Sequence, residues 1–205
     1  MNTKFIHLLY VPTMACNKQC RYCYLEDHTV DTLRGEDCLE TLQYAIAKFR
    51  EADVVPFNIS LHGGEVTTLQ EREFHDLIQY ISRYYHDMRE LITDAGFRVG
   101  HPHIKTNLYG LDKHIETIRE FNVSISGSLD LPLSLHEKYR VTKGGEGTLE
   151  RLFRSHWNGY WIISDCWRRS LTRKKYLPRS FGSILNSWIR SSRISDFWTG
   201  TRAWT

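Results

Sequence analysis

Apolar and polar positions in residues 1–154 follow two different periods. Short apolar runs, typical of buried strands, cover residues 5–11, 56–61, 103–106 and 123–129. Apolar residues recur every three or four positions, as in helices that bury one face, over residues 35–53, 69–92 and 111–120, and from near Thr148. Strands that alternate with helices pair in parallel through right-handed crossovers. The pattern predicts an α/β fold of about four β-α units, in an open sheet or a barrel.

Residues 155–205 differ from the rest in composition. They contain nine Lys or Arg against two acidic residues, together with all six tryptophans, and show no sustained period. We interpret this segment as an irregular, basic Trp/Arg/Ser-rich tail, out of frame or disordered, behind a core of residues 1–154. A surface that stacks on nucleic-acid bases is the less favoured alternative, because the segment lacks the signature of a binding module.

Neither membrane insertion nor export is expected. No apolar run approaches the roughly 18 residues of a membrane-spanning helix. The apolar start leads into Pro12 and a polar loop without a cleavage site, so we expect a strand and a cytoplasmic protein. Three of the five cysteines fall within eight residues, which favours a metal site over disulfides, and Cys38 and Cys166 are expected to be buried or idle thiols.

Cys16, Cys20 and Cys23 are the main candidates for chemistry, in a loop after the first expected strand. Thiolates are the usual ligands of iron–sulfur clusters, and these gaps let one loop hold three irons of a [4Fe-4S] cluster. The fourth iron stays open for a second molecule. A zinc site needs a fourth Cys or His, and the only close candidate, His28, is poorly spaced. The cluster is therefore preferred over zinc.

Together with Tyr22 and Tyr24, these cysteines form a Cys-x3-Cys-x-Tyr-Cys-Tyr pattern. It resembles the cysteine loop of radical S-adenosylmethionine (SAM) enzymes. The resemblance implies a partial parallel (β/α) barrel in which SAM binds the open iron and is cleaved to a radical that removes hydrogen from the substrate. It also implies that Tyr22 lies against the adenine; an aromatic plug in the barrel mouth is the alternative.

Gly63, Gly64 and Glu65 follow the second expected strand and resemble the Gly-Gly-Glu motif of that family. The resemblance implies that they bind the methionine ammonium of SAM. Glycines allow close approach of the backbone, and a carboxylate pairs well with a cationic amino group. A plain turn is the alternative. Val66 stands where the family usually has proline, so the turn is expected to be less rigid.

The remaining candidates follow the third and fourth expected strands. Thr106 and Asn107 resemble a Thr-Asn step that implies contact with the ribose or the substrate; a strand-end turn is the alternative. Ser128 and Arg140 lie in a stretch resembling the subgroup that modifies peptides and proteins, which includes anaerobic sulfatase-maturating enzymes. The resemblance implies that they meet the SAM ribose and carboxylate, with a surface salt bridge as the alternative for Arg140. Leu131 replaces the usual glycine there.

The resemblance covers residues 1–154 and implies the N-terminal part of a radical SAM enzyme. It further implies a peptide or protein substrate and an electron donor such as flavodoxin or ferredoxin, with no catalytic residue assigned. One cysteine follows residue 38, so auxiliary clusters are not expected. An enzyme that acts on a small molecule or RNA, and a zinc-binding or interaction protein, remain as alternatives.

Overall fold

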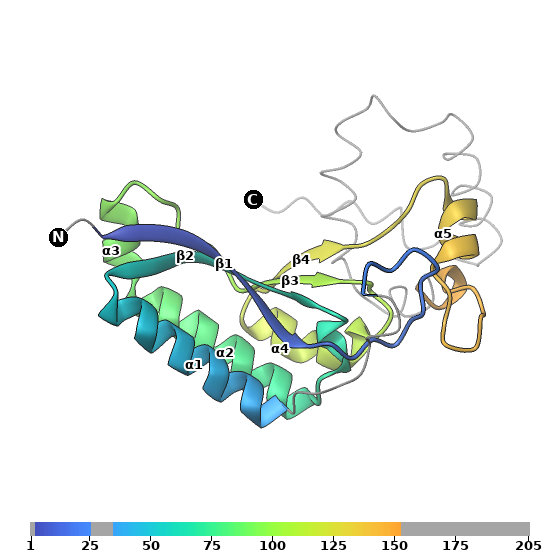
Figure 1. Ribbon diagram of the computed structural model, residues 1–205, viewed down its shortest axis with the longest axis horizontal. Coiled ribbons are helices and arrows are strands. Elements are labelled where there is room, and N and C mark those ends of the chain that lie inside the picture. Colours follow the sequence, from blue (N-terminus) through green and yellow to red (C-terminus); the bar gives the residue numbers. More distant parts are fainter. Residues whose placement is uncertain (1–2, 26–34, 153–205) are drawn as a thin grey trace, which may run out of the picture. The chain divides into compact units, whose positions relative to one another are not determined.

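A four-stranded parallel sheet forms the centre of the computed structural model, which describes residues 3–25 and 35–152 (Figure 1). The strands lie in the order β1 (Lys4–Thr13), β2 (Val54–Gly63), β3 (His103–Thr106) and β4 (Ser124–Gly127). All three neighbouring pairs are parallel. The expected α/β fold of four parallel strands, a partial barrel, is therefore confirmed, with each strand within a few residues of its predicted position.

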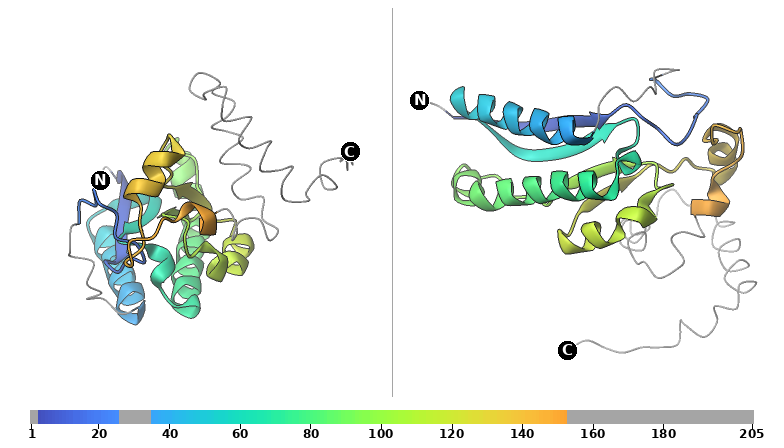
Figure 2. Two further views of the ribbon diagram at one scale, coloured as in Figure 1. Left: turned by 90° about the vertical axis from the view of Figure 1, so that its right-hand side faces the viewer. Right: turned by 90° about the horizontal axis from the view of Figure 1, so that it is seen from below.

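Helices cover one face of this sheet. α1 (Gly35–Glu51), α2 (Glu71–Asp87) and α4 (Ile115–Glu120) lie below it in Figure 1, and Figure 2 shows the same layer from two further sides. The remaining elements are α3 (Arg89–Asp94), α5 (Leu133–Tyr139) and the 3-10 turns η1 (Val66–Thr68) and η2 (Leu111–His114). No helix in residues 3–25 and 35–152 is long and apolar enough to cross a membrane.

Two helical expectations differ from the structure. The single helix expected over 69–92 is wrong: Met88, at φ −95° and ψ 3°, leaves the helical region and separates α2 from α3. Helix α5 was not expected at all. The helix expected near Thr148 begins at residue 149. The basic tail over 155–205, the boundary at 154, His28 and Cys166 lie outside the described residues.

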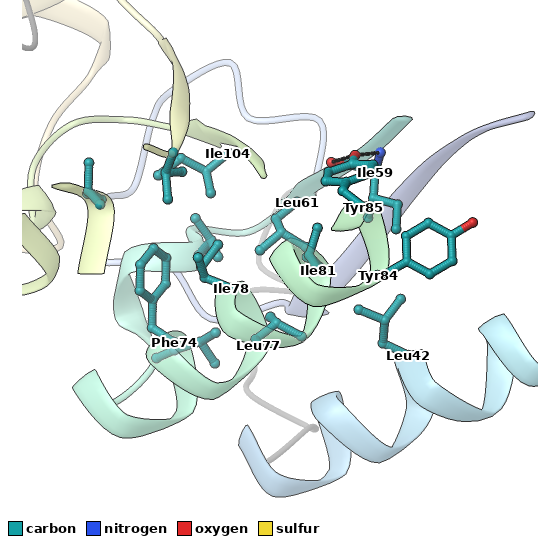
Figure 3. Close-up of a cluster of buried hydrophobic side chains, with 14 of the residues drawn as sticks. Leu42, Ile59, Leu61, Phe74, Leu77, Ile78, Ile81, Tyr84, Tyr85 and Ile104 are labelled. Carbon is teal, nitrogen blue, oxygen red and sulfur yellow. Dashed lines mark hydrogen bonds between the residues drawn. The ribbon is translucent and has the colours of Figure 1, made fainter. Parts of the chain in front are cut away.

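The apolar core lies between the sheet and α1 and α2. Leu61 of β2 and Phe74 and Ile81 of α2 are fully buried in it (Figure 3). Tyr84 and Tyr85 also enter the core, where their hydroxyls bond to the β2 backbone at the carbonyl of Pro56 (2.9 Å) and the amide of Ile59 (2.5 Å). Each large apolar side chain buried here contributes about 1.5–3 kcal/mol. The core thus packs α2 against strand β2.

Beyond the carboxyl ends of the strands lie the segments that carried the sequence motifs. The cysteine loop, coloured blue after β1 in Figure 1, and helix α5 gather at this end. Backbone hydrogen bonds join them: the amides of Gln19 and Arg21 donate to Val141 and Tyr139. Parallel sheets collect functional groups at this edge, and the candidate site is built here.

Candidate functional site

The loop between β1 and α1 carries the three predicted cluster cysteines. Cys16, Cys20 and Cys23 are partly buried and have free thiols. The amide of Cys23 donates to the carbonyl of Cys20 (3.0 Å), so these two residues form a tight turn. Cys38, by contrast, is fully buried in α1 with its thiol against the carbonyl of Pro12, which confirms the expectation of a structural thiol.

Cys20 and Cys23 border an open pocket of about 620 Å³, whose lining also includes residues 141–145. In residues 3–25 and 35–152, no three His, Cys, Asp or Glu side chains lie close enough to hold a single metal ion. A zinc ion draws all its ligands to one centre, whereas the three thiolates of a [4Fe-4S] cluster each bind a different iron and stand further apart. The three thiol donors and the adjoining space fit a [4Fe-4S] cluster.

The surroundings of Cys16 and Cys20 favour the neutral thiol in the absence of iron. Burial raises the pKa of both thiols. Because a metal binds the thiolate, loading the site must release protons. Asn107 Nδ2 lies 3.8 Å from Cys16 Sγ, and N–H groups directed at a ligating sulfur orient it and tune a cluster. The site therefore contains the sulfur ligands and, at Cys16, an N–H group that can orient one of them.

The Glu65 carboxylate lies where β2 meets the end of β3, and only 2% of the residue is exposed. One oxygen, Oε1, accepts hydrogen bonds from the hydroxyls of Thr106 (2.6 Å) and Thr67 (2.8 Å) and from the Thr67 amide (3.2 Å). The other, Oε2, accepts one bond, from the amide of Asn107 (2.6 Å). A carboxylate oxygen accepts about two such bonds, so Oε2 retains capacity for a further donor. Three predicted site residues, Glu65, Thr106 and Asn107, thus meet at one carboxylate.

Gly63 and Gly64 bring the end of β2 against the start of the cysteine loop. Gly63 adopts φ +118°, and a Cβ there would lie 2.5 Å from the carbonyl oxygen of Thr13. A Cβ on Gly64 would overlap the carbonyls of Met14 and Ala15. Glycine is therefore required at both positions for packing against the loop. Contact of Gly63 and Gly64 with the SAM ammonium stays a prediction.

Arg140 and Tyr22, predicted as separate contacts, share one partner that the sequence analysis left without a role. Arg140 donates to both carboxylate oxygens of Asp130, from Nε (3.0 Å) and Nη2 (3.2 Å). The Tyr22 hydroxyl donates to Asp130 as well, and its ring centre lies 5.4 Å from the Arg140 guanidinium. Burial alone would raise the pKa of Asp130, but hydrogen bonds from Arg140 and Tyr22 bring it below its usual value. Two of the five guanidinium N–H donors are thereby used.

Lys18 was not singled out from the sequence, yet it is 2% exposed within the cysteine loop. Its ammonium donates to the carbonyl of Asn107 (3.3 Å) and to the hydroxyl of Thr148 (3.1 Å). Burial lowers the Lys18 pKa to about 8. Lysine is almost never fully buried without partners, so this side chain ties the loop to the end of β3 and to the segment after α5.

Thr148 and His136 complete this buried group. His136 Nδ1 accepts from the amide of Asp130 (3.3 Å), so its Nε2 carries the proton and lies 3.2 Å from the Thr148 hydroxyl. That hydroxyl donates to the carbonyl of Arg140 (2.8 Å). We call the buried polar side chains at this edge the polar cluster: Lys18, Glu65, Thr106, Asn107, His136 and Thr148.

Ser128 is joined to the site through its backbone. Its amide donates to the carbonyl of Thr106 (2.9 Å), which extends the β3–β4 pairing toward the site, and the residue is partly buried. Of the predicted residues, then, the structure brings Glu65, Thr106 and Asn107 into one hydrogen-bonded group. It pairs Tyr22 with Arg140 through Asp130, and it puts Ser128 at the neighbouring strand end.

Comparison with known proteins shows which families and proteins this chain is similar to. Residues 7–145 match the family model of the 4Fe-4S single cluster domain. An uncharacterized protein of Synechocystis is 28% identical over 147 residues, covering 69% of this chain and 34% of the relative. An uncharacterized protein of Methanothermobacter thermautotrophicus is 24% identical over 151 residues, covering 73% and 51%. The chain thus spans a third to a half of the length of these relatives.

Solved structures share the fold. Native anSMEcpe with bound AdoMet superimposes with a TM-score of 0.52 at 18% identity, over 74% of this chain and 39% of that chain. The same protein with bound AdoMet and the Cp18Cys peptide gives a TM-score of 0.51 at 19% identity, over 74% and 38%. At this identity the likeness establishes the arrangement of strands and helices.

Proposed function

Because the chain belongs to the 4Fe-4S single cluster domain family, we propose that Cys16, Cys20 and Cys23 hold a [4Fe-4S] cluster beside which SAM binds, in the catalytic domain of a radical SAM enzyme that modifies a peptide or protein. When bound, such a cluster would supply one electron to the SAM sulfonium; the bond from sulfur to the 5′ carbon would break, methionine would leave, and the 5′-deoxyadenosyl radical would take a hydrogen atom from the substrate. The observation that carries the proposal is the meeting of the free-thiol loop with the Glu65 carboxylate at one edge of the sheet.

Glu65 is the residue proposed to hold the SAM ammonium. The backbone bonds from Gly64 to Thr13 (3.1 Å) and from Glu65 to Ala15 (2.7 Å) fix it directly against the cysteine loop. Four protein donors already orient its carboxylate, and Oε2, which accepts one of these four bonds, retains acceptor capacity. A carboxylate fixed in this way meets an ammonium without reorganising, which favours binding.

Tyr22 and Arg140 are proposed to hold the rest of SAM. The Tyr22 residue is 49% exposed, so one face of its ring is open to an adenine. The salt bridge to Asp130 orients Arg140, and its remaining N–H donors suit a carboxylate. Ser128 is proposed to meet the SAM ribose from the end of β4, and Thr106 and Asn107 to contact the ribose or the substrate from the end of β3.

The peptide or protein substrate and an electron donor such as flavodoxin or ferredoxin complete the proposal. A peptide substrate is supported by the sequence pattern from Ser128 to Arg140 and by the fold shared with anSMEcpe, which has been solved with bound peptides. The chain covers 39% of that structure's length. The peptide substrate and the electron donor are therefore proposed for a whole enzyme that contains a domain of this kind.

The test is SAM cleavage by the full chain after anaerobic reconstitution with iron and sulfide. Dithionite-reduced protein is expected to release 5′-deoxyadenosine, and Cys20→Ser is expected to abolish release by removing a cluster ligand. Cys38→Ser is the matched control, because Cys38 lies outside the loop and serine keeps a hydrogen-bond donor to Pro12, with a hydroxyl in place of the thiol. Equal release by wild type and Cys20→Ser, or none by wild type carrying a full cluster, contradicts the proposal.

A further inference from the structure

The face of the sheet opposite α1, α2 and α4 carries a row of hydrogen-bonded histidines and serines that crosses all four strands. Ser60 Oγ of β2 lies 2.9 Å from His7 Nε2 of β1 and 2.9 Å from His103 Nδ1 of β3. His103 Nε2 lies 2.8 Å from Ser126 Oγ of β4. Each histidine offers one N–H and one acceptor when neutral, so the row is one chain of donors and acceptors.

Two further basic side chains share this face. Side chains two positions apart on a strand point to the same side, so His62 lies beside Ser60, and Lys105 lies beside His103. The rings of His62 and His103 are 6.5 Å apart. The four strands contain no aspartate or glutamate. The face therefore presents three imidazoles and one ammonium without an acidic residue from its own strands.

The basic groups on this face act against one another. Burial and then Lys105 and His7 lower the pKa of His62. Burial and then His62, His7 and Lys105 lower the pKa of His103. The facing groups are thus His7 from β1, His62 from β2 and Lys105 from β3, while β4 adds only serines. A bound anion would relieve this repulsion and draw protons onto the rings.

We propose that this face is a specificity site for a carboxylate of the substrate, bound by Lys105, His62 and the His7–Ser60–His103–Ser126 row. The proposal rests on the proposed function, because it assigns the carboxylate to an acidic residue of a peptide. His103 lies three positions before Thr106, which bonds to Glu65. At about 3.3 Å per residue, His103 lies roughly 10 Å along β3 from the Thr106 end, and Lys105 and His62 lie nearer to that end.

The test uses the full chain and two probes that differ in one charge, acetyl-Gly-Gly-Glu-Gly-Gly-amide and its glutamine analogue. Histidine ring NMR signals are followed at low salt, because screening weakens surface charge interactions. The glutamate peptide is expected to shift the His62 and His103 signals saturably, and more tightly at pH 6 than at pH 8. Lys105→Met, an exposed position, is expected to weaken this binding roughly tenfold. Lys113→Met, an exposed lysine on η2, is the matched control and leaves binding unchanged.

Equal shifts with the glutamine peptide, no shifts with either peptide, or a response to inorganic phosphate alone would overturn the proposal. The readout does not depend on SAM cleavage. Carboxylate binding without 5′-deoxyadenosine release would sink the proposed function and leave this site standing. Release of 5′-deoxyadenosine without carboxylate binding would do the reverse, and the histidine row would then only join the strands.

Discussion

The apolar core and the polar cluster are both buried, but they are stabilised by opposite means. In the core, Phe74, Ile78 and Ile81 are fully buried against other apolar side chains. In the polar cluster, Glu65 and Lys18 are each 2% exposed and are surrounded by hydrogen-bond partners. A core of this kind tolerates changes that preserve volume. A buried charge tolerates little change, because a lost partner leaves it unsatisfied.

In this fold the apolar core mainly stabilises the sheet, whereas the polar cluster also holds the candidate site together. The core fixes the sheet against α1 and α2 through apolar side chains. The polar cluster fixes the loop against the ends of β2 and β3 and against the segment after α5. Substitutions in the core should therefore alter the free energy of unfolding alone, whereas substitutions in the cluster should also alter the site.

The largest effect is expected from a cavity in the core. Ile81→Ala should lower the free energy of unfolding by about 2–5 kcal/mol, because it removes buried methyl groups and leaves a void. Urea denaturation followed by circular dichroism measures it. Leu91→Ala, on the exposed side of α3, is the control and should cost less than about 0.5 kcal/mol. Equal losses at the two positions would show that α2 does not clamp the sheet.

Removing the charge of Glu65 should affect both stability and the site. Glu65→Gln replaces one acceptor oxygen with an NH₂ group that faces donors, so a loss of about 1.5–3 kcal/mol is expected, together with weaker SAM binding. Glu116→Gln, at an exposed position in α4, is the control. Denaturation and SAM titration of the cluster-loaded protein measure the two effects. A variant that loses stability but binds SAM normally would remove Glu65 from the site.

Acid should weaken the polar cluster through His136 before it weakens the core. Burial lowers the His136 pKa to about 4, below the ordinary value of about 6.5. The folded state therefore resists protonation. The contribution of neutral His136 to the free energy of unfolding is complete above about pH 6.5, and it is lost as the pH falls toward 4. Urea denaturation at pH 7 and pH 5 measures the loss, and His136→Gln should reduce the dependence on pH. An unchanged dependence in that variant would rule His136 out as its source.

The smallest effect is expected at the open rim of the site. Tyr22→Phe removes one hydrogen bond to Asp130 and should cost about 0.5–1.5 kcal/mol at most, with iron content unchanged. The aromatic ring, which is proposed to meet the adenine, is retained. Tyr44→Phe on α1 is the control, since Tyr44 is also largely exposed. A Tyr22→Phe protein that fails to load iron would show that the hydroxyl helps to build the cysteine loop.

The sequence predicted the parts of the fold that depend on local pattern. Apolar runs and helical spacing located all four strands and helices α1, α2 and α4. The break at Met88 escaped prediction because no glycine or proline marks it, and the change in direction is made by backbone angles that many residues adopt. Helix α5 escaped because its seven residues are too few to show a reliable period.

The site was predictable where it depends on strand ends and not where it depends on burial. Glu65, Thr106 and Asn107 could be expected together, because parallel strands end at the same edge. Lys18 could not, since a lysine in a polar loop is ordinarily exposed. The roles of Asp130 and Thr148 arise from contacts with residues far along the chain, Tyr22 and Lys18. A one-dimensional pattern does not encode such contacts.

The electron paramagnetic resonance spectrum of the reduced, anaerobically reconstituted chain, recorded with and without SAM, tests the central claim most directly. We expect four irons and four sulfides per chain, and a signal whose shape changes when SAM binds beside the three-cysteine cluster. Zinc without sulfide, or an iron–sulfur signal that SAM leaves unchanged, would contradict it.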